Sequence, residues 1–388
     1  MIAGMGRSRV LIAVAVVMVV TAGSLLVWRG LGGGPTGSST SAGTPGGTTP
    51  AGGGTGSAQA TQPATGPALK PLMLGLIDRQ GLPSREYLSS VDGLVVNVNW
   101  SDLQPSAAGP IADGTVVDAT LAQVRALNRE RTGQPLGIKL RVYAGIHAPD
   151  WAKQLGGAPI TVTDPTDGVT GMVGRFWSAE FGSAYADFET RLAARYDGVP
   201  ELREVTISRC TTVYAEPFIR DRNDTTTVAA LRAAGYTEDA DLRCLREQID
   251  AHQVWRTTRS GLAVNPYQRI DTSARGTAGD TVTEAMMVYC RKQLGGRCVL
   301  ENNSLRYPPL GGAYSTMYTE IARLGPPITF QTATSARVGD LAATVDLAAR
   351  LGGDAVELPA GYAGLTPGAL QPLRARLLAS SAAVAGAG

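Results

Sequence analysis

The sequence has few of the residues on which several common kinds of site depend. Its 388 residues include only two histidines and four cysteines, and His147 and His252 lie far apart in the sequence. No cysteine pair has the short spacing of a zinc knuckle, so we expect no metal site. No Gly-x-Ser-x-Gly elbow of a serine hydrolase occurs, and no glycine-rich phosphate-binding turn follows the first predicted strand. We therefore expect a protein that works without a metal or cofactor.

A strong excess of charge is also missing. The formal net charge is +2, and arginine outnumbers lysine without gathering into a basic stripe. A nucleic-acid-binding protein needs such a stripe to neutralise phosphates. We therefore expect no nucleic-acid partner, and we expect the protein to be monomeric.

One long apolar run is present, at residues 10–27, and it follows Arg7 and Arg9. A helix rises about 1.5 Å per residue, so a run of this length can just cross a bilayer. Its basic flank predicts an N-terminus in the cytoplasm. We expect residues 1–29 to form a cytoplasmic N-terminus and an uncleaved signal anchor of a single-pass membrane protein. A signal peptide that is cleaved to give a secreted protein is the alternative.

The chain then divides into a linker and one folded domain. Residues 30–68 consist mainly of Gly, Ser, Thr, Pro and Ala, which cannot bury enough apolar surface to offset the entropy of ordering, so they predict a flexible tether. Residues 69–388 contain no second break of this kind, and we expect them to form one domain on the extracytoplasmic side. Four cysteines in an exported chain suggest two disulfides, and we favour Cys210 with Cys244 and Cys290 with Cys298.

Short apolar runs alternate with amphipathic helical stretches through the folded domain. Such alternation favours a parallel sheet, and eight units favour closure into a (β/α)8 barrel. A doubly wound open sheet is the competing architecture. The predicted strands are 72–77, 93–100, 138–144, 202–207, 262–267, 298–303, 328–332 and 355–359. The predicted helices include 179–196, 228–257, 281–294, 314–324 and 340–351.

Polar and aromatic side chains follow the carboxyl ends of these strands, where a barrel enzyme keeps its chemistry. Amides and carboxylates bind sugar hydroxyls, and large aromatic rings stack on the apolar face of a pyranose. The sequence therefore predicts a glycan substrate. The candidate substrate-binding residues are Asp78, Asn97, Asn99, Trp100, His147, Trp151, Tyr214, Tyr267, Asn302, Gln331 and Glu357.

The stretch from the second to the fourth strand resembles a known group of enzymes. Its segments are 96–105, 145–151, a hairpin-like stretch at 160–175, and 184–197. In pattern they resemble glycoside hydrolase barrels of the broad clan that includes families 42 and 5. The resemblance implies an acid/base glutamate after strand four, usually in Asn-Glu-Pro, and a nucleophilic glutamate after strand seven. Here Glu216-Pro217 is kept, Ala215 replaces the asparagine, and Gln331 lies near the expected nucleophile position.

Because glutamine cannot act as a carboxylate, a second catalytic acid must come from another strand. We expect Glu216 to protonate the leaving oxygen, and Glu301, at the end of strand six, to attack the anomeric carbon or activate water. Glu357 in strand eight is the other candidate. An ion pair between Glu301 and an interior arginine, such as Arg141 or Arg209, would instead make it part of the scaffold. A barrel that binds sugar without cutting it is the alternative function.

Overall fold

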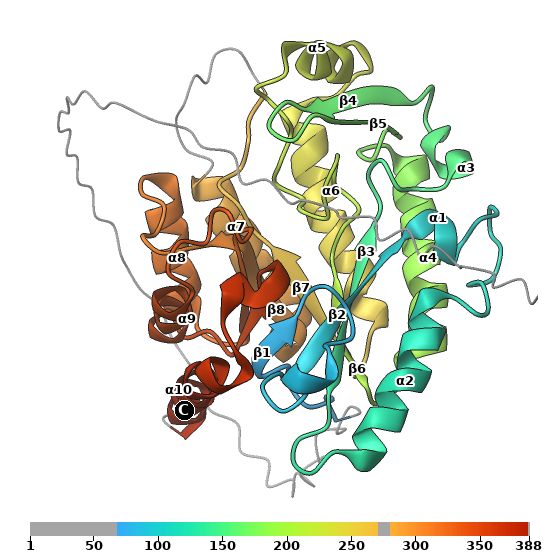
Figure 1. Cartoon of the computed structure of the whole chain (residues 1–388). Helices are drawn as coiled ribbons and strands as arrows, with labels where there is room; N and C mark the ends of the chain where they lie inside the picture. The colour runs from blue at the N-terminus through green and yellow to red at the C-terminus, as the bar shows by residue number, and fades with distance from the viewer. Residues whose placement is uncertain (1–67, 271–279, 387–388) are drawn as a thin grey trace, which may run out of the picture.

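The computed structural model describes residues 68–270 and 280–386 and contains eight parallel strands closed into a barrel (Figure 1). Their order around the barrel is β1-β10-β9-β8-β7-β6-β3-β2. The (β/α)8 prediction is confirmed, and the open-sheet alternative is wrong. The strands are β1 (Gly75–Asp78), β2 (Gly93–Asn99), β3 (Gly137–Tyr143), β6 (Leu202–Thr206), β7 (Arg259–Ala263), β8 (Cys298–Leu305), β9 (Ile328–Thr332) and β10 (Ala355–Leu358).

Helices surround the strands on the outside of the barrel (Figure 1). The longer ones are α2 (Val116–Glu130), α4 (Ala179–Tyr196), α5 (Thr225–Ala233), α6 (Glu238–Ala251), α7 (Asp280–Leu294), α8 (Ala313–Leu324), α9 (Leu341–Arg350) and α10 (Pro367–Gly386). Short helical turns are α1 (Trp100–Leu103), α3 (Asp150–Lys153), η1 (Arg85–Tyr87), η2 (His252–Val254), η3 (Gly295–Arg297) and η4 (Ala360–Gly364).

Two sequence predictions of element bounds were wrong for identifiable reasons. The single helix expected at 228–257 is two helices, because Gly235 takes a φ of +87° and Thr237 then caps α6. The fifth strand begins at Arg259 and ends at Ala263, earlier than the expected 262–267. Beyond Ala263 the chain continues through Val264 and Asn265 to Pro266, which has no N–H to donate to a ladder.

The main hydrophobic core lies between the barrel and its helices. Trp100 is completely buried there, and its ring makes edge-to-face contacts with Trp151, Phe181 and Tyr185. The Trp100 indole N–H donates to the Gln104 side chain at 3.0 Å. Trp100 therefore anchors α4 to the barrel, and the substrate-binding role expected for it has no support in these contacts.

An antiparallel hairpin, β4 (Ile160–Asp164) and β5 (Val169–Val173), interrupts the barrel after β3, where the sequence predicted a hairpin-like segment. In Figure 1 it lies beside α5 at one end of the molecule. Both predicted disulfides are confirmed: Cys210 with Cys244, and Cys290 with Cys298.

The anchor expected at residues 10–27 and the linker at 30–68 lie outside the described residues, except for residue 68. Within residues 68–270 and 280–386, no helix is both long and apolar enough to cross a bilayer.

Candidate active site in the barrel mouth

The barrel interior contains a cluster of charged side chains centred on Lys139 of β3. The Lys139 ammonium lies 2.5 Å from Glu301 of β8, 2.8 Å from Glu357 of β10 and 3.0 Å from Glu204 of β6. Arg141, two residues further along β3, donates to both carboxylate oxygens of Glu357 at 2.6 and 2.7 Å. These ion pairs join β3 to strands β6, β8 and β10 across the barrel, so the two cations and three carboxylates all point inward.

Three carboxyl groups thus face two cations, and one proton balances the charge of the cluster. Burial raises the pKa of Glu301 to about 8, and the neighbouring Glu204 and Glu357 add to the rise against the opposing effect of Lys139. The Glu204 carboxyl lies close to Glu301 as well as to Lys139, so ionisation of both carboxyl groups is unfavourable. Glu301 therefore favours the protonated form and lies within the interior cluster around Lys139.

The Glu301 carboxyl is closely packed inside the barrel. A Cβ added at Gly261 of β7 would lie 1.6 Å from Glu301 Oε1. Glu301 is 1% exposed, and β8 continues for four residues beyond it, to Leu305. The sequence placed Glu301 at the end of its strand, whereas the structure places it well below the mouth.

Solvent reaches the carboxyl end of β2 above this cluster. On β2, Val95 belongs to a small interior apolar cluster, and the alternation of a strand directs Asn97 and Asn99 to the same side. Asn97 is nevertheless exposed and Asn99 is half-buried. The Tyr143 hydroxyl lies 3.4 Å from Asn97 Oδ1, and the His147 ring packs edge-on against Tyr143. These four side chains lie together at one side of the barrel's carboxyl end, where Asn97 is the exposed one.

Glu216 lies on the loop after β6 and is enclosed by two amides. Asn265, two residues beyond the end of β7, donates to Glu216 Oε2 at 2.6 Å, and Asn303 of β8 is also hydrogen-bonded to this carboxyl. Burial raises the pKa of Glu216, although both amides and the positive charge of Arg141 oppose the rise. No cation lies within ion-pair distance of Glu216 among residues 68–270 and 280–386.

Glu357 has the opposite electrostatic character. Burial tends to raise its pKa, but Arg141 and Lys139 outweigh burial and hold the pKa at about 2. Its charge in turn contributes to the raised pKa of Glu216. Three strands separate β6 from β10 in either direction around the barrel, so these two groups belong to opposite sides. One buried carboxyl, Glu216 beyond the end of β6, thus favours the protonated form, and another, Glu357 inside the barrel, favours the ionised form.

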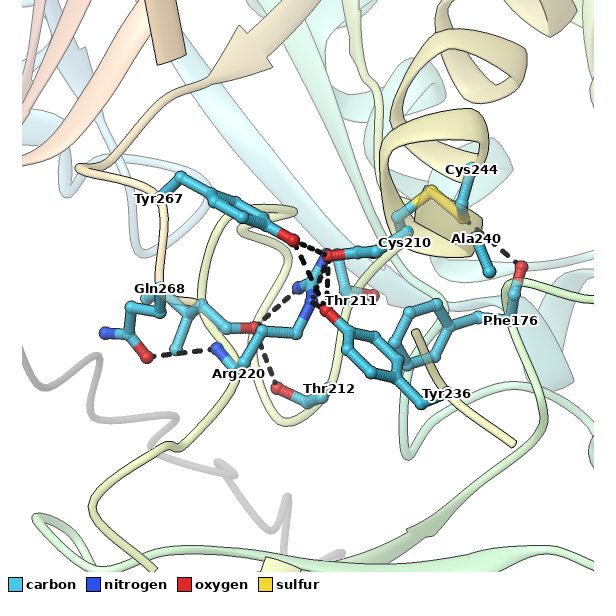
Figure 2. A network of polar contacts seen from close by, with 12 residues as sticks. Phe176, Cys210, Thr211, Thr212, Arg220, Tyr236, Ala240, Cys244, Tyr267 and Gln268 are labelled. Atoms are coloured by element: carbon cyan, nitrogen blue, oxygen red, sulfur yellow. Dashed lines mark hydrogen bonds and ion pairs between the residues drawn. A yellow bond between two sulfur atoms is a disulfide. The ribbon is translucent and has the colours of Figure 1, made fainter. Parts of the chain in front are cut away.

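A buried polar network holds the loop that carries Glu216 (Figure 2). The Arg220 guanidinium donates to both carboxylate oxygens of Asp241 on α6, at 2.6 and 2.8 Å. The hydroxyls of Tyr236 and Tyr267 donate to the same carboxylate at 2.6 and 2.7 Å. The Cys210–Cys244 disulfide links the same loop to α6. Tyr267, expected to bind substrate, therefore supports the loop instead.

The other side of this loop rests on the segment after β3. The N–H of Gly145 donates to the Thr211 hydroxyl at 3.0 Å, and the carbonyl of Thr212 passes so close to Gly145 that a Cβ there would lie 1.8 Å from it. The Tyr214 hydroxyl donates to Asp164 at 2.6 Å and to Asp167 at 2.8 Å. Tyr214 thus ties the loop to the β4–β5 hairpin.

Several other predicted site residues also have partners within the protein. Asn302 points away from the barrel interior, donates to the Val264 carbonyl at 2.9 Å and accepts from the Tyr318 hydroxyl at 2.9 Å. Trp151 donates its indole N–H to the Gln104 carbonyl. Gln331 is buried and donates to the carbonyl of Asn303, whose side chain is hydrogen-bonded to Glu216, at 3.3 Å.

Asp78 also points away from the centre of the mouth. Its carboxylate accepts a hydrogen bond from Tyr362 in η4, where residues 361–363 all have left-handed backbone angles. Burial raises the pKa of Asp78, and the Tyr362 hydrogen bond opposes this. Asp78 therefore fastens η4 to the end of β1.

Lys139 and Asn265 are among the important residues that the sequence interpretation missed. Lys139 lies inside a predicted strand, and a charged residue at an inward position was the available signal. Asn265 lay within a misplaced fifth strand, so its place at the mouth could not be read correctly. Among the residues that the structure describes, no group of three histidines, cysteines or carboxylates has the geometry of a metal site.

The fold and these side chains define the class of a (β/α)8 barrel with polar groups at its carboxyl end. No family model and no curated protein matches the sequence. Solved structures to which the fold is similar include the catalytic domain of β-amylase from Paenibacillus polymyxa, at 10% identity and a TM-score of 0.48, covering 81% of this chain and 100% of that one.

Two further similar structures are also glycoside hydrolases by name. An endo-β-1,4-glucanase from Xanthomonas axonopodis pv. citri has 10% identity and a TM-score of 0.41, covering 75% of this chain and 87% of that one. Endo-glycoceramidase II from Rhodococcus sp. has 14% identity and a TM-score of 0.41, covering 79% and 81%. Similarity at this level of identity concerns the fold alone. Any argument for an activity must come from this chain's own residues.

Proposed function

We propose that the protein is a carbohydrate-active barrel enzyme, a glycoside hydrolase in which Glu216 protonates the leaving oxygen. Glu216 lies beyond the carboxyl end of β6, between the amides of Asn265 and Asn303. Burial raises its pKa, and a carboxyl group that keeps its proton closer to neutral pH is suited to general acid catalysis. The same amides hold the Glu216 carboxyl in one orientation, from which it would deliver its proton to the leaving oxygen.

Glu357 is the second carboxylate in this proposal, in place of Glu301. Its pKa of about 2 keeps it ionised at any ordinary pH, and a fixed negative charge stabilises the oxocarbenium-like transition state of glycoside cleavage. The observation that carries the proposal is the position of the Glu216 carboxyl beyond the end of β6, bound by Asn265 at 2.6 Å, together with opposite pKa shifts at Glu216 and Glu357. Environments that shift the pKa values of two carboxyl groups in opposite directions are typical of a general acid and its ionised partner.

The sugar would lie over the polar side chains of the mouth. Asn97 and Asn99 are accessible there and offer both donors and acceptors to hydroxyl groups. Tyr143 and His147 form an edge-to-face pair beside them, and such rings provide apolar surface for a pyranose. No metal or cofactor is needed for this chemistry.

We further propose that the barrel works outside the cytoplasm, tethered to the membrane through residues 10–27 and the linker. The apolar run with its basic N-terminal flank supports the tether. The two disulfides support an oxidising compartment.

A sugar-binding barrel without hydrolysis is the second candidate. It is favoured by Gln331 at the strand-seven position and by the ion pairs that occupy Glu357. A catalytic carboxylate there would have to act while bound to Arg141 and Lys139.

Released reducing sugar, measured over a panel of glycans, distinguishes the two candidates. We expect turnover by the native protein, and a loss of about 100-fold or more in Glu216→Gln with binding retained, because general acid catalysis contributes about 10²–10⁴ in rate. Glu357→Gln should also lose turnover, and Glu86→Gln, at an exposed position, serves as the control. Binding without any product in the native protein would support the sugar-binding barrel and contradict hydrolysis.

A further inference from the structure

Two arginines at the barrel mouth are buried without a carboxylate partner. Arg79 follows β1, Arg306 follows β8, and each is 8% exposed. Neither has an acidic group within ion-pair distance in residues 68–270 and 280–386. Three other buried arginines do have such a partner: Arg141 with Glu357, Arg209 with Glu247 and Arg220 with Asp241.

The hydrogen bonds of the two guanidinium groups leave most of their donors unused. Arg79 donates through Nη1 to the Thr332 carbonyl at 2.8 Å, and Arg306 donates through Nε to the Ser304 carbonyl at 3.2 Å. Their remaining nitrogens do not belong to the fully enclosed side-chain atoms that lack a partner. These donors therefore face the space that solvent still reaches.

Both groups lie on the same part of the rim. Thr332, which accepts from Arg79, pairs across the β8–β9 ladder with Leu305, the residue before Arg306. Arg306 lies in the electrostatic environment of Tyr314, which in turn is close to Glu216. On the other side, Arg79 lies in the environment of Glu357. Arg79 is thus on the Glu357 side of this part of the rim, and Arg306 is on the side of Tyr314.

Enclosure of these cations is unfavourable in the free protein. Burial lowers the pKa of both arginines, because a charged guanidinium loses hydration when it is enclosed. An anionic group bound by these guanidinium groups would supply a counter-charge at ion-pair distance, and a guanidinium fork matches a carboxylate or sulfate with paired hydrogen bonds.

We propose that Arg79 and Arg306 bind an anionic group of the sugar, so that the substrate is an acidic glycan. The inference rests on the proposed function, since it names the substrate class of the same mouth. A carboxylate of a hexuronic acid and a sulfate ester share the required chemistry.

A glycan panel with matched neutral and acidic members tests the inference on the full-length protein. The probes are oligogalacturonate, its carboxyl-reduced neutral counterpart and a sulfated galactose oligosaccharide, with affinity measured by calorimetry. We expect an acidic probe to bind about tenfold or more tighter than the neutral one, as charge-assisted hydrogen bonds provide. Preference for the uronate or for the sulfated sugar identifies which anion is recognised.

Variants connect this preference to the two side chains. Arg79→Gln and Arg306→Gln should lose the acidic preference and keep the affinity for the neutral probe, while Arg306→Lys keeps part of the preference. Arg203→Gln is the matched control, because Arg203 is also 8% exposed and lacks an ion pair, but lies at the start of β6, at the opposite end of the barrel. Thermal unfolding of each variant checks that it is folded.

Two results would overturn the inference in different ways. Equal binding or cleavage of neutral and acidic probes would refute the acidic substrate and leave the proposed hydrolase intact. No binding and no cleavage of any probe would refute both.

Discussion

Replacing Glu301 by glutamine should change how the stability of the barrel depends on pH. In the folded protein, burial and the neighbouring Glu204 raise the pKa of Glu301 from 4.5 to about 8. Between these values the unfolded chain releases a proton that the folded protein keeps. A rise in pH across this window therefore favours the unfolded state.

The size of this effect follows from the shift in pKa. Each unit of pKa difference corresponds to about 1.4 kcal/mol, and exchange of the proton among the three coupled carboxyl groups reduces the total. We expect the Glu301 contribution to lower the free energy of unfolding by about 2 to 5 kcal/mol between pH 4.5 and pH 8. Below pH 4.5 and above pH 8 this contribution no longer changes.

Glutamine at position 301 resembles the protonated acid, since its amide can donate toward Glu204 and its carbonyl can accept from Lys139. The variant should match the native protein near pH 5 to within about 1 kcal/mol and lack the decline toward pH 8. Urea unfolding followed by tryptophan fluorescence at intervals of one pH unit measures the free energy of unfolding. Glu86→Gln, at an exposed position, is the control.

Native and Glu301→Gln curves that run parallel between pH 5 and pH 8 would refute the shared proton. An equally large loss of stability in the variant at every pH would indicate instead that Glu301 is ionised and is needed by Lys139. Either outcome would contradict the charge balance inferred for the cluster.

Three further changes test the packing around the site. Gly261→Ala should lower the melting temperature in thermal unfolding, because its Cβ would collide with the Glu301 carboxyl and overpacking costs about 1–3 kcal/mol; an unchanged melting temperature would contradict the interior position of that carboxyl. Asp241→Asn should cost about 3–5 kcal/mol in urea unfolding by leaving Arg220 buried without a counter-charge, and turnover should fall with it as the Glu216 loop loosens; full stability would contradict the network. Replacing Cys290 and Cys298 by serine removes a disulfide with a sequence separation of 8 and should cost about 2–3 kcal/mol in stability. Turnover at low temperature should be kept, since this disulfide joins α7 to the start of β8, away from the proposed site. Lost turnover in a folded variant would contradict the placement of the site at the carboxyl end of the barrel.

The sequence was sufficient to predict the architecture because the signals for it are local and repeated. Eight apolar runs separated by amphipathic helices predicted the barrel, and one strand, β9, was predicted with the observed bounds. The error at 228–257 arose because helical periodicity continues across Gly235, and only the backbone angle of that residue reveals the break.

The site was predictable only in part, because roles depend on which side of a strand a residue faces. Glu216 and Asn97 were correctly expected near the carboxyl ends of strands. Tyr214, Tyr267 and Asn302 have suitable chemistry for sugar binding, but their polar groups are bound to other parts of the chain. Such long-range partners cannot be read from local sequence.

Glu301 illustrates the same limit. In sequence, an acidic residue near a strand end looks the same whether its side chain is exposed to solvent or forms an ion pair with a buried cation. Its ion pair with Lys139 joins residues 162 positions apart in the sequence. Arg141 and Arg209, the cations considered from the sequence, pair with Glu357 and Glu247 instead.

The most direct test of the central claim compares two leaving groups in the Glu216→Gln variant. A methyl glycoside needs a proton on its leaving oxygen, whereas a 2,4-dinitrophenyl glycoside of the same sugar leaves without one. If Glu216 is the proton donor, kcat/KM for the methyl glycoside should fall by about 10²–10⁴, and that for the dinitrophenyl glycoside should remain within about tenfold of the native value. Equal losses on both substrates, or no loss on either, would contradict the assignment of Glu216.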